Sequence, residues 1–194
     1  CSSDLDRIGT QALEDPDGTA FFLKTNVGNT ITDGVELYVE GKFFPETSVS
    51  NLGLFTASSW MNGRYVKGTV VVSGENQDLT GNKLESVPTW ISRSGANFTW
   101  EGLLATVQYS YVSESFADAL NTVTPSANGA RGLVPAYGIL DAYVSWRSGR
   151  YMVRFGVNNL TDEQYFTKRP TGYPGGGVWN SDGRSVTATV GIGF

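Results

Sequence analysis

The sequence of 194 residues contains no histidine and a single cysteine, Cys1. One cysteine excludes a disulfide framework within the chain, and the missing histidine excludes the common His/Cys metal sites and disfavours general-base catalysis. Basic residues number 14 and acidic residues 19, so the net charge of −5 argues against a nucleic-acid partner, which would require a basic stripe. Even the longest apolar runs are short, such as the three valines at 70–72. A membrane-spanning helix needs about 18 or more apolar residues, so none is expected.

The sequence does have a strict two-residue alternation at its C-terminal end, from Arg184 to Phe194. One face of this predicted strand is apolar throughout, and the other carries only serine, threonine and glycine. A length of about ten residues suits a tilted strand that crosses a bilayer, and an aromatic final residue is typical of the closing strand of an outer-membrane barrel. The alternative is the edge strand of a soluble sandwich. The apolar face comprises Val186, Ala188, Val190, Ile192 and Phe194.

Similar segments recur along the chain, and we predict an all-β fold of about seven antiparallel transmembrane strands, an incomplete ring. The direction of the segment 51–61 cannot be assigned, because its two faces are equally apolar. Short turns are expected near Pro45, Gly102 and Gly149, and long polar loops at 74–81, 116–135 and 165–182, an alternation typical of outer-membrane barrels. No segment has the periodicity and caps of a helix. The other expected strands are 35–40, 90–100, 103–111, 140–146 and 151–158.

The first five residues, Cys1 to Leu5, resemble the translation of a sequencing-adapter end, and the N-terminal residues do not have the basic and apolar regions expected of a signal peptide. We therefore expect residues 1–5 to be a non-native scar and residues 6–194 to be the C-terminal segment of a longer protein.

The segment from Arg154 to Phe166, followed by a loop, Gly183-Arg184 and the terminal Phe194, resembles the C-terminus of TonB-dependent outer-membrane receptors. The earlier segments 26–36 and 81–88 resemble two further strand motifs of this family. The residues that carry the resemblance are Gly156, Val157, Asn159, Leu160, Asp162, Tyr165, Gly183, Arg184 and Phe194, with Asn26, Gly28, Gly34, Glu36, Gly81, Leu84 and Pro88 upstream.

The resemblance implies a 22-stranded barrel around an N-terminal plug in the outer membrane of a Gram-negative bacterium. It implies active import of an iron chelate, energised by TonB through the missing N-terminal part. It also implies that the barrel-assembly machinery reads Phe194 as an assembly signal. No cofactor and no catalytic residue are implied.

The segments 121–125 and 168–175 resemble the subset of receptors for ferric dicitrate. Ferric chelates of this kind are anionic, so cationic side chains on outward loops would capture them through charge-assisted hydrogen bonds. The candidate ligand-binding residues are Arg131, Lys168, Arg169 and Tyr173. Contact with lipopolysaccharide phosphates, or plain solvation, is the alternative reading for these loop cations.

Trp60, Trp90, Trp100, Trp146 and Tyr151 fall near predicted strand ends and are expected to form interfacial girdles next to outer-membrane lipid. Three alternatives remain open for the whole protein. They are a porin-like barrel without plug or TonB box, a soluble β-sandwich binding module, and an outer-membrane enzyme with its base upstream.

Overall fold

The computed structural model describes residues 2–14, 20–44, 49–72, 74–170 and 175–193, with the backbone alone for residues before 28. The described residues form strands, turns and loops without a helix, so the all-β prediction is confirmed. No helix among them is long and apolar enough to cross a membrane.

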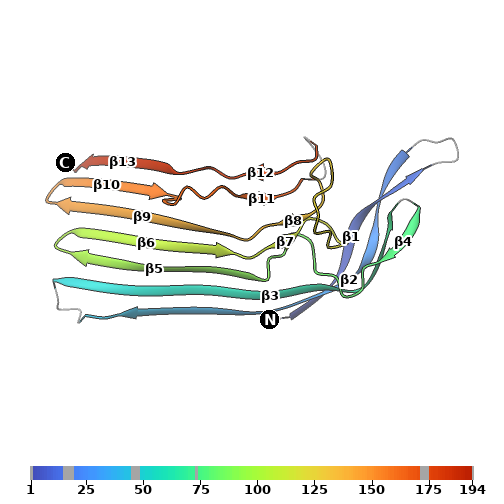
Figure 1. Cartoon of the computed structure of the whole chain (residues 1–194). Coiled ribbons are helices and arrows are strands. Elements are labelled where there is room, and N and C mark those ends of the chain that lie inside the picture. Colours follow the sequence, from blue (N-terminus) through green and yellow to red (C-terminus); the bar gives the residue numbers. More distant parts are fainter. Residues whose placement is uncertain (1, 15–19, 45–48, 73, 171–174, 194) are drawn as a thin grey trace.

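Eight strands follow one another across an open antiparallel sheet, in the order β1-β2-β3-β5-β6-β9-β10-β13 (Figure 1). This is one strand more than the sequence predicted, because β1 was missed. The bounds are β1 Ser2–Glu14, β2 Ala20–Lys42, β3 Ser50–Val72, β5 Trp90–Trp100, β6 Leu103–Val112, β9 Tyr137–Ser148, β10 Tyr151–Asn158 and β13 Ser185–Ile192.

The prediction of a polar loop at 74–81 is partly wrong, since this segment contains strand β4 (Glu75–Asp78), which pairs with residues 69–72 at the end of β3. The two other long loops also contain short strands. Ser115–Phe116 (β7) pairs with Leu133–Val134 (β8), and Phe166–Lys168 (β11) pairs with Trp179–Asn180 (β12). The expected turn at Pro45 lies outside the described residues.

Tight turns join the strands at the end of the sheet that holds the C-terminus (Figure 1). Trp100 pairs with Leu103 across Glu101-Gly102, and both turn residues have positive φ, 41° and 87°. Two residues of positive φ match the right-handed twist of the flanking strands. In the described part of the chain, the long connections after β3, β6 and β10 lie at the opposite end, as the alternation of short and long loops predicted.

Strand register places the predicted apolar faces side by side. Val190 on β13 pairs with Val153 on β10, which pairs with Trp146 on β9. Directly opposed residues in an antiparallel sheet point to the same face. The register also settles which side chains of β3 lie on the apolar face, because Leu54 pairs with Ala96 and Trp60 with Trp90. One face of the sheet is therefore largely apolar from β2 to β13, and we call it the outer face.

Aromatic residues border the outer face at two levels. Trp90 and Trp100 begin and end β5, ten residue steps apart. At ~3.3 Å per residue and a tilt of about 40° this spans a height of about 25 Å, the height of the apolar band of a membrane barrel. Trp146 and Tyr151 join the lower level, near Trp100, and Trp60 joins the upper level. Trp60 is not near a strand end as expected, because β3 continues for twelve residues past the belt to Val72.

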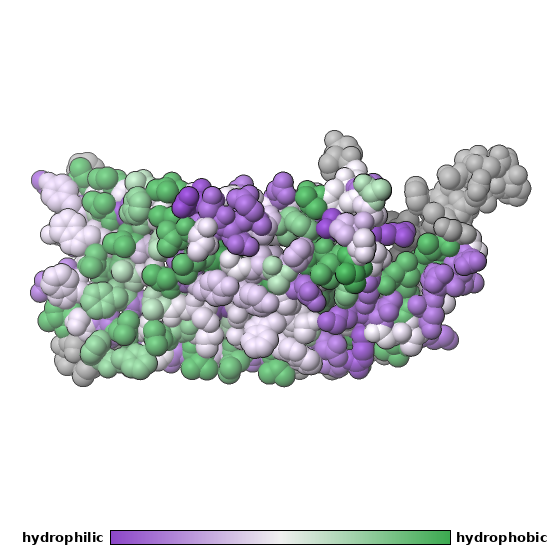
Figure 2. Space-filling view, in the orientation of Figure 1, coloured by the Kyte–Doolittle hydropathy of each residue, from purple (hydrophilic) through white to green (hydrophobic). Residues whose placement is uncertain are grey.

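The opposite, inner face is mostly polar, with Asn97, Thr106, Tyr143 and Arg154 on successive strands. Thr106 Oγ1 donates to Asn97 Oδ1 at 2.8 Å. The buried apolar core lies beyond the membrane level, where Tyr65, Leu79 and Leu84 pack with residues of the 113–136 connection. On the face in view in Figure 2, apolar residues are densest toward the end with the tight turns, and strongly hydrophilic ones gather toward the other end.

Candidate functional site

The connections 113–136 and 159–184 lie side by side at the end of the sheet opposite the tight turns (Figure 1). We call this end the outer end. The ring of Tyr137, at the start of β9, stacks on the ring of Tyr165 with centroids 4.4 Å apart. A cavity of about 120 Å³ lies at this junction, between Pro135-Ala136 and residues 163–166. The structure therefore brings together the two loops that carry the predicted ligand-binding residues.

Arg169 clamps the two connections to each other. Its Nε donates to the Leu133 carbonyl at 3.1 Å and its Nη1 to the Gly129 carbonyl at 3.2 Å. Its guanidinium also lies over the ring of Phe166, 4.8 Å from the centroid. These contacts direct Arg169 to the backbone of the neighbouring loop, which leaves fewer of its five N–H donors for a ligand.

Lys168 and Arg131 are exposed. The Lys168 ammonium lies 5.6 Å from the ring centroid of Trp179 on β12, a cation–π arrangement. Arg131 sits in a turn in which its backbone N–H donates to Ser126 Oγ at 3.0 Å. Both cations can therefore face an incoming anion, whereas Tyr173 and Phe194 lie outside the described residues.

The motif at the outer end of β10 forms a compact polar cluster. Asn159 is 3% exposed and has a left-handed φ of 52°. Its side chain donates to the Glu163 carbonyl and accepts from the Glu163 N–H, and its own N–H donates to Asp141 Oδ1 on β9 at 2.9 Å. Asp162 accepts from the backbone N–H of Arg184 at 2.9 Å. The motif therefore joins the outer ends of β9, β10 and β13.

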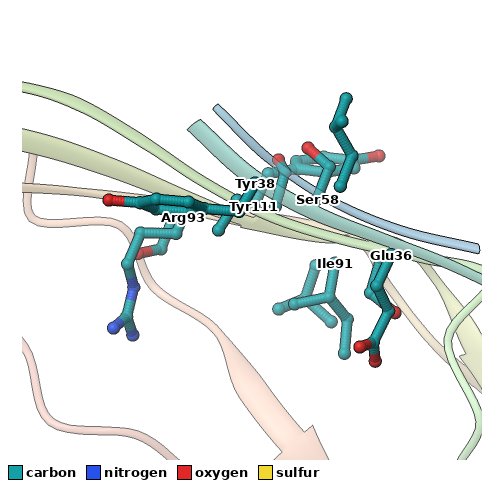
Figure 3. A pocket seen from close by; sticks show the side chains of 12 residues that line it. Glu36, Tyr38, Ser58, Ile91, Arg93 and Tyr111 are labelled. Carbon is teal, nitrogen blue, oxygen red and sulfur yellow. The ribbon is translucent and has the colours of Figure 1, made fainter. Parts of the chain in front are cut away.

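A hollow of about 550 Å³ crosses β2, β3, β5 and β6. Glu36, Ile91 and Arg93 point to the same side of the sheet in Figure 3, and register pairs Ile91 with Ser59, which pairs with Glu36. These positions alternate with the outward ones, so they belong to the inner face. A second hollow of about 310 Å³ is lined by Arg154, Tyr143 and Thr187, among others.

Sequence reasoning missed the inner-face arginines as functional candidates. The alternation along the strand could have found them, because Arg154 lies between the apolar residues Val153 and Phe155 of β10 and must therefore point to the opposite, inner face. No group of acidic or cysteine side chains that could hold a metal ion is present in the part of the chain that the structure describes.

An antiparallel sheet with an apolar outer face, a polar inner face and long connections at one end has the architecture of a membrane β-barrel wall. The family model "TonB dependent receptor-like, beta-barrel" matches residues 5–160. The chain therefore belongs to this family, whose members are outer-membrane barrels of Gram-negative bacteria. The alternative prediction of a soluble β-sandwich is therefore wrong.

The Vitamin B12 transporter BtuB of Vibrio vulnificus (strain CMCP6) is 28% identical over 145 residues, which is 70% of this chain and 22% of the transporter. The ferric citrate transporter FecA, in its unliganded form, superposes with a TM-score of 0.71 at 21% identity, covering 85% of this chain and 24% of FecA. The siderophore receptor PiuA of Acinetobacter baumannii gives 0.67 at 21% identity, covering 94% and 24%. The chain thus spans about a quarter of the length of these relatives.

Proposed function

We propose that this chain is the C-terminal barrel segment of a longer receptor that imports a metal chelate across the outer membrane, driven by TonB. Membership of the family supports the transport role, and the relatives are named for vitamin B12, ferric citrate and a siderophore. The upstream part of the receptor would hold the plug and the contact with TonB.

The observation that carries the ligand assignment is the pair of outer connections joined by Arg169. A joined pair of loops holds its exposed cations in fixed positions, and preorganisation lowers the entropic cost of binding. Lys168 and Arg131 are the proposed anion-binding residues, and an anionic iron chelate such as ferric dicitrate is the proposed ligand. Arg169 shapes the site, while Tyr173 retains its proposed role from the sequence.

The test is equilibrium binding of ferric dicitrate to the full-length receptor and to its Lys168→Gln/Arg131→Gln variant. Each charge-assisted hydrogen bond contributes about 1.5–3 kcal/mol, so the double variant should bind at least about tenfold more weakly. Arg147→Gln/Arg150→Gln, which removes the same charge from the tight turn between β9 and β10 at the opposite end of the sheet, is the matched control and should bind as the parent does.

Binding by the parent with no loss in the loop variant would remove Lys168 and Arg131 from the site. No binding by the parent would overturn the citrate assignment alone. Uptake of labelled chelate by cells with and without TonB then tests the energised transport, and equal uptake would contradict it.

We also propose three partners beyond the ligand. Outer-membrane lipid and lipopolysaccharide would cover the outer face, TonB would act through the upstream part, and the barrel-assembly machinery would read Phe194.

A further inference from the structure

Two basic residues lie next to each other above the upper aromatic belt. Beyond β4 the chain runs back along β3, and Lys83 forms an isolated antiparallel bridge with Arg64. Arg64 follows Trp60 by four residues of regular β3 pairing, so both point to the outer face. Leu84, the neighbour of Lys83, packs into the buried core on the inner side, which agrees with an outward Lys83.

The backbone of this pair lies just above the polar layer of a bilayer, within reach of that layer for long basic side chains. Four residues of a strand tilted by about 40° rise about 10 Å above Trp60. The polar layers add about 5–8 Å on each side of the hydrocarbon core, and long basic side chains extend along the surface to place their charges. Lys83 Nζ donates to Thr89 Oγ1 at 3.3 Å, and Thr89 directly precedes Trp90, so the ammonium is drawn toward the belt.

The charge of this site is positive. Asp33 forms a salt bridge with Arg64 at 2.9 Å, and both side chains are about 40% exposed. This carboxylate offsets one of the two cations and orients the guanidinium, which retains further donors. Within the described part of the chain, no carboxylate is paired with Lys83.

The outer face directly below the site is polar, unlike most of the outer band. Trp60 pairs with Trp90, and below them Ser58 pairs with Ser92. One row further down, Thr56 Oγ1 and Ser94 Oγ are hydrogen bonded at 2.8 Å. The hydroxyls of Ser58 and Ser92, directly beneath the two indoles, suit a lipid whose polar groups continue just below its phosphate, such as amide, ester and hydroxyl groups at the start of its acyl chains. The deeper pair of hydroxyls satisfies itself.

We propose that this surface of β3, β5 and the 79–89 segment binds a phosphorylated glycolipid of the outer leaflet. Arg64 and Lys83 contact the phosphate, and the two indoles contact the sugar and the acyl junction. The hydroxyls of Ser58 and Ser92 bond the linkage groups. The proposal requires the barrel to lie in the outer membrane, but it is independent of which nutrient is imported.

The test uses the full-length receptor in detergent, titrated with bisphosphorylated lipid A and with the same lipid after removal of its phosphates. The unmodified receptor should bind the phosphorylated form at least about tenfold more tightly, since each cation near an anionic lipid surface contributes roughly a factor of five. Arg64→Gln/Lys83→Gln should lose that preference. Arg147→Gln/Arg150→Gln, an equal loss of charge at the tight turn between β9 and β10, should keep it.

Equal affinity of the unmodified receptor for the two lipids would overturn the proposal without any variant being needed. A preference that survives in Arg64→Gln/Lys83→Gln would overturn the assigned residues. Competition by inorganic phosphate as strong as that by lipid A would show a simple anion site and overturn the lipid assignment. Failure of chelate binding in the loop variant bears only on the import site, so the two proposals fail separately.

Discussion

At the scale of single residues, the motif that carried the family resemblance is explained by backbone geometry. Asn159 must take a left-handed conformation, satisfy Glu163 with its amide and align its N–H with Asp141. Asparagine tolerates this conformation better than most residues, and its short amide can bond to nearby backbone groups. The residue thus ends β10 and starts the outer connection at a defined angle.

Replacing Asn159 by alanine should destabilise the barrel by about 2–4 kcal/mol, because two buried hydrogen bonds are lost and a left-handed alanine is strained. Asn159→Gly is the matched variant, since it loses the same bonds without the strain. It should be more stable than the alanine variant by about 1 kcal/mol. Urea unfolding of the full-length receptor in lipid vesicles measures both, and equal midpoints for the two variants would contradict a conformational role.

At the scale of strands, register distributes the chemistry between the two faces. Val107 on β6 points outward between Ala96 and Ala142. Ala96 lies between the belts marked by Trp90 and Trp100, so Val107 is close to the middle of the apolar band. The next residue, Gln108, points inward and pairs with Asp141 on β9.

Val107→Arg should therefore cost about 2–4 kcal/mol, the penalty for a cation facing lipid near the midplane. Gln108→Arg, one residue away on the wet face and opposite a carboxylate, should cost less than about 1 kcal/mol. Folding yields and urea midpoints in vesicles distinguish the two. If both variants fold equally well, the assignment of inner and outer faces is wrong.

The sequence predicted the membrane-level strands because lipid on one side and water on the other impose a period of two. The same signal disappears beyond the belt, where both faces of a strand meet water or loops. For that reason the last twelve residues of β3 and the fully exposed β4 were missed. Glycines inside strands also weaken the pattern, yet the structure fills their space with rings, such as that of Tyr143 against Gly156.

At the scale of the whole molecule, the long connections act together rather than as separate loops. The sequence predicted that Arg131, Lys168 and Arg169 belong to loops at the same end, because the chain direction alternates. It could not predict that Arg169 would bond to the backbone of the other loop, since that depends on the path of both connections. The clamp divides the three cations into two that face solvent and one that supports them.

The clamp gives a test that uses the chain's own arginine as a reporter. The carbonyls of Gly129 and Leu133, which accept from Arg169, flank the Arg131–Gly132 bond, where trypsin can cut. Hydrogen bonds from a charged group contribute about 1.5–3 kcal/mol each, so Arg169→Gln should raise the open population of this loop at least about tenfold. Cleavage after Arg131, followed by mass spectrometry on the folded full-length receptor, should accelerate by that factor. Lys168→Gln removes a neighbouring cation whose ammonium lies near the Trp179 ring, so its cleavage rate should match the parent. An Arg169→Gln rate equal to both would show that the two connections hold together without the clamp.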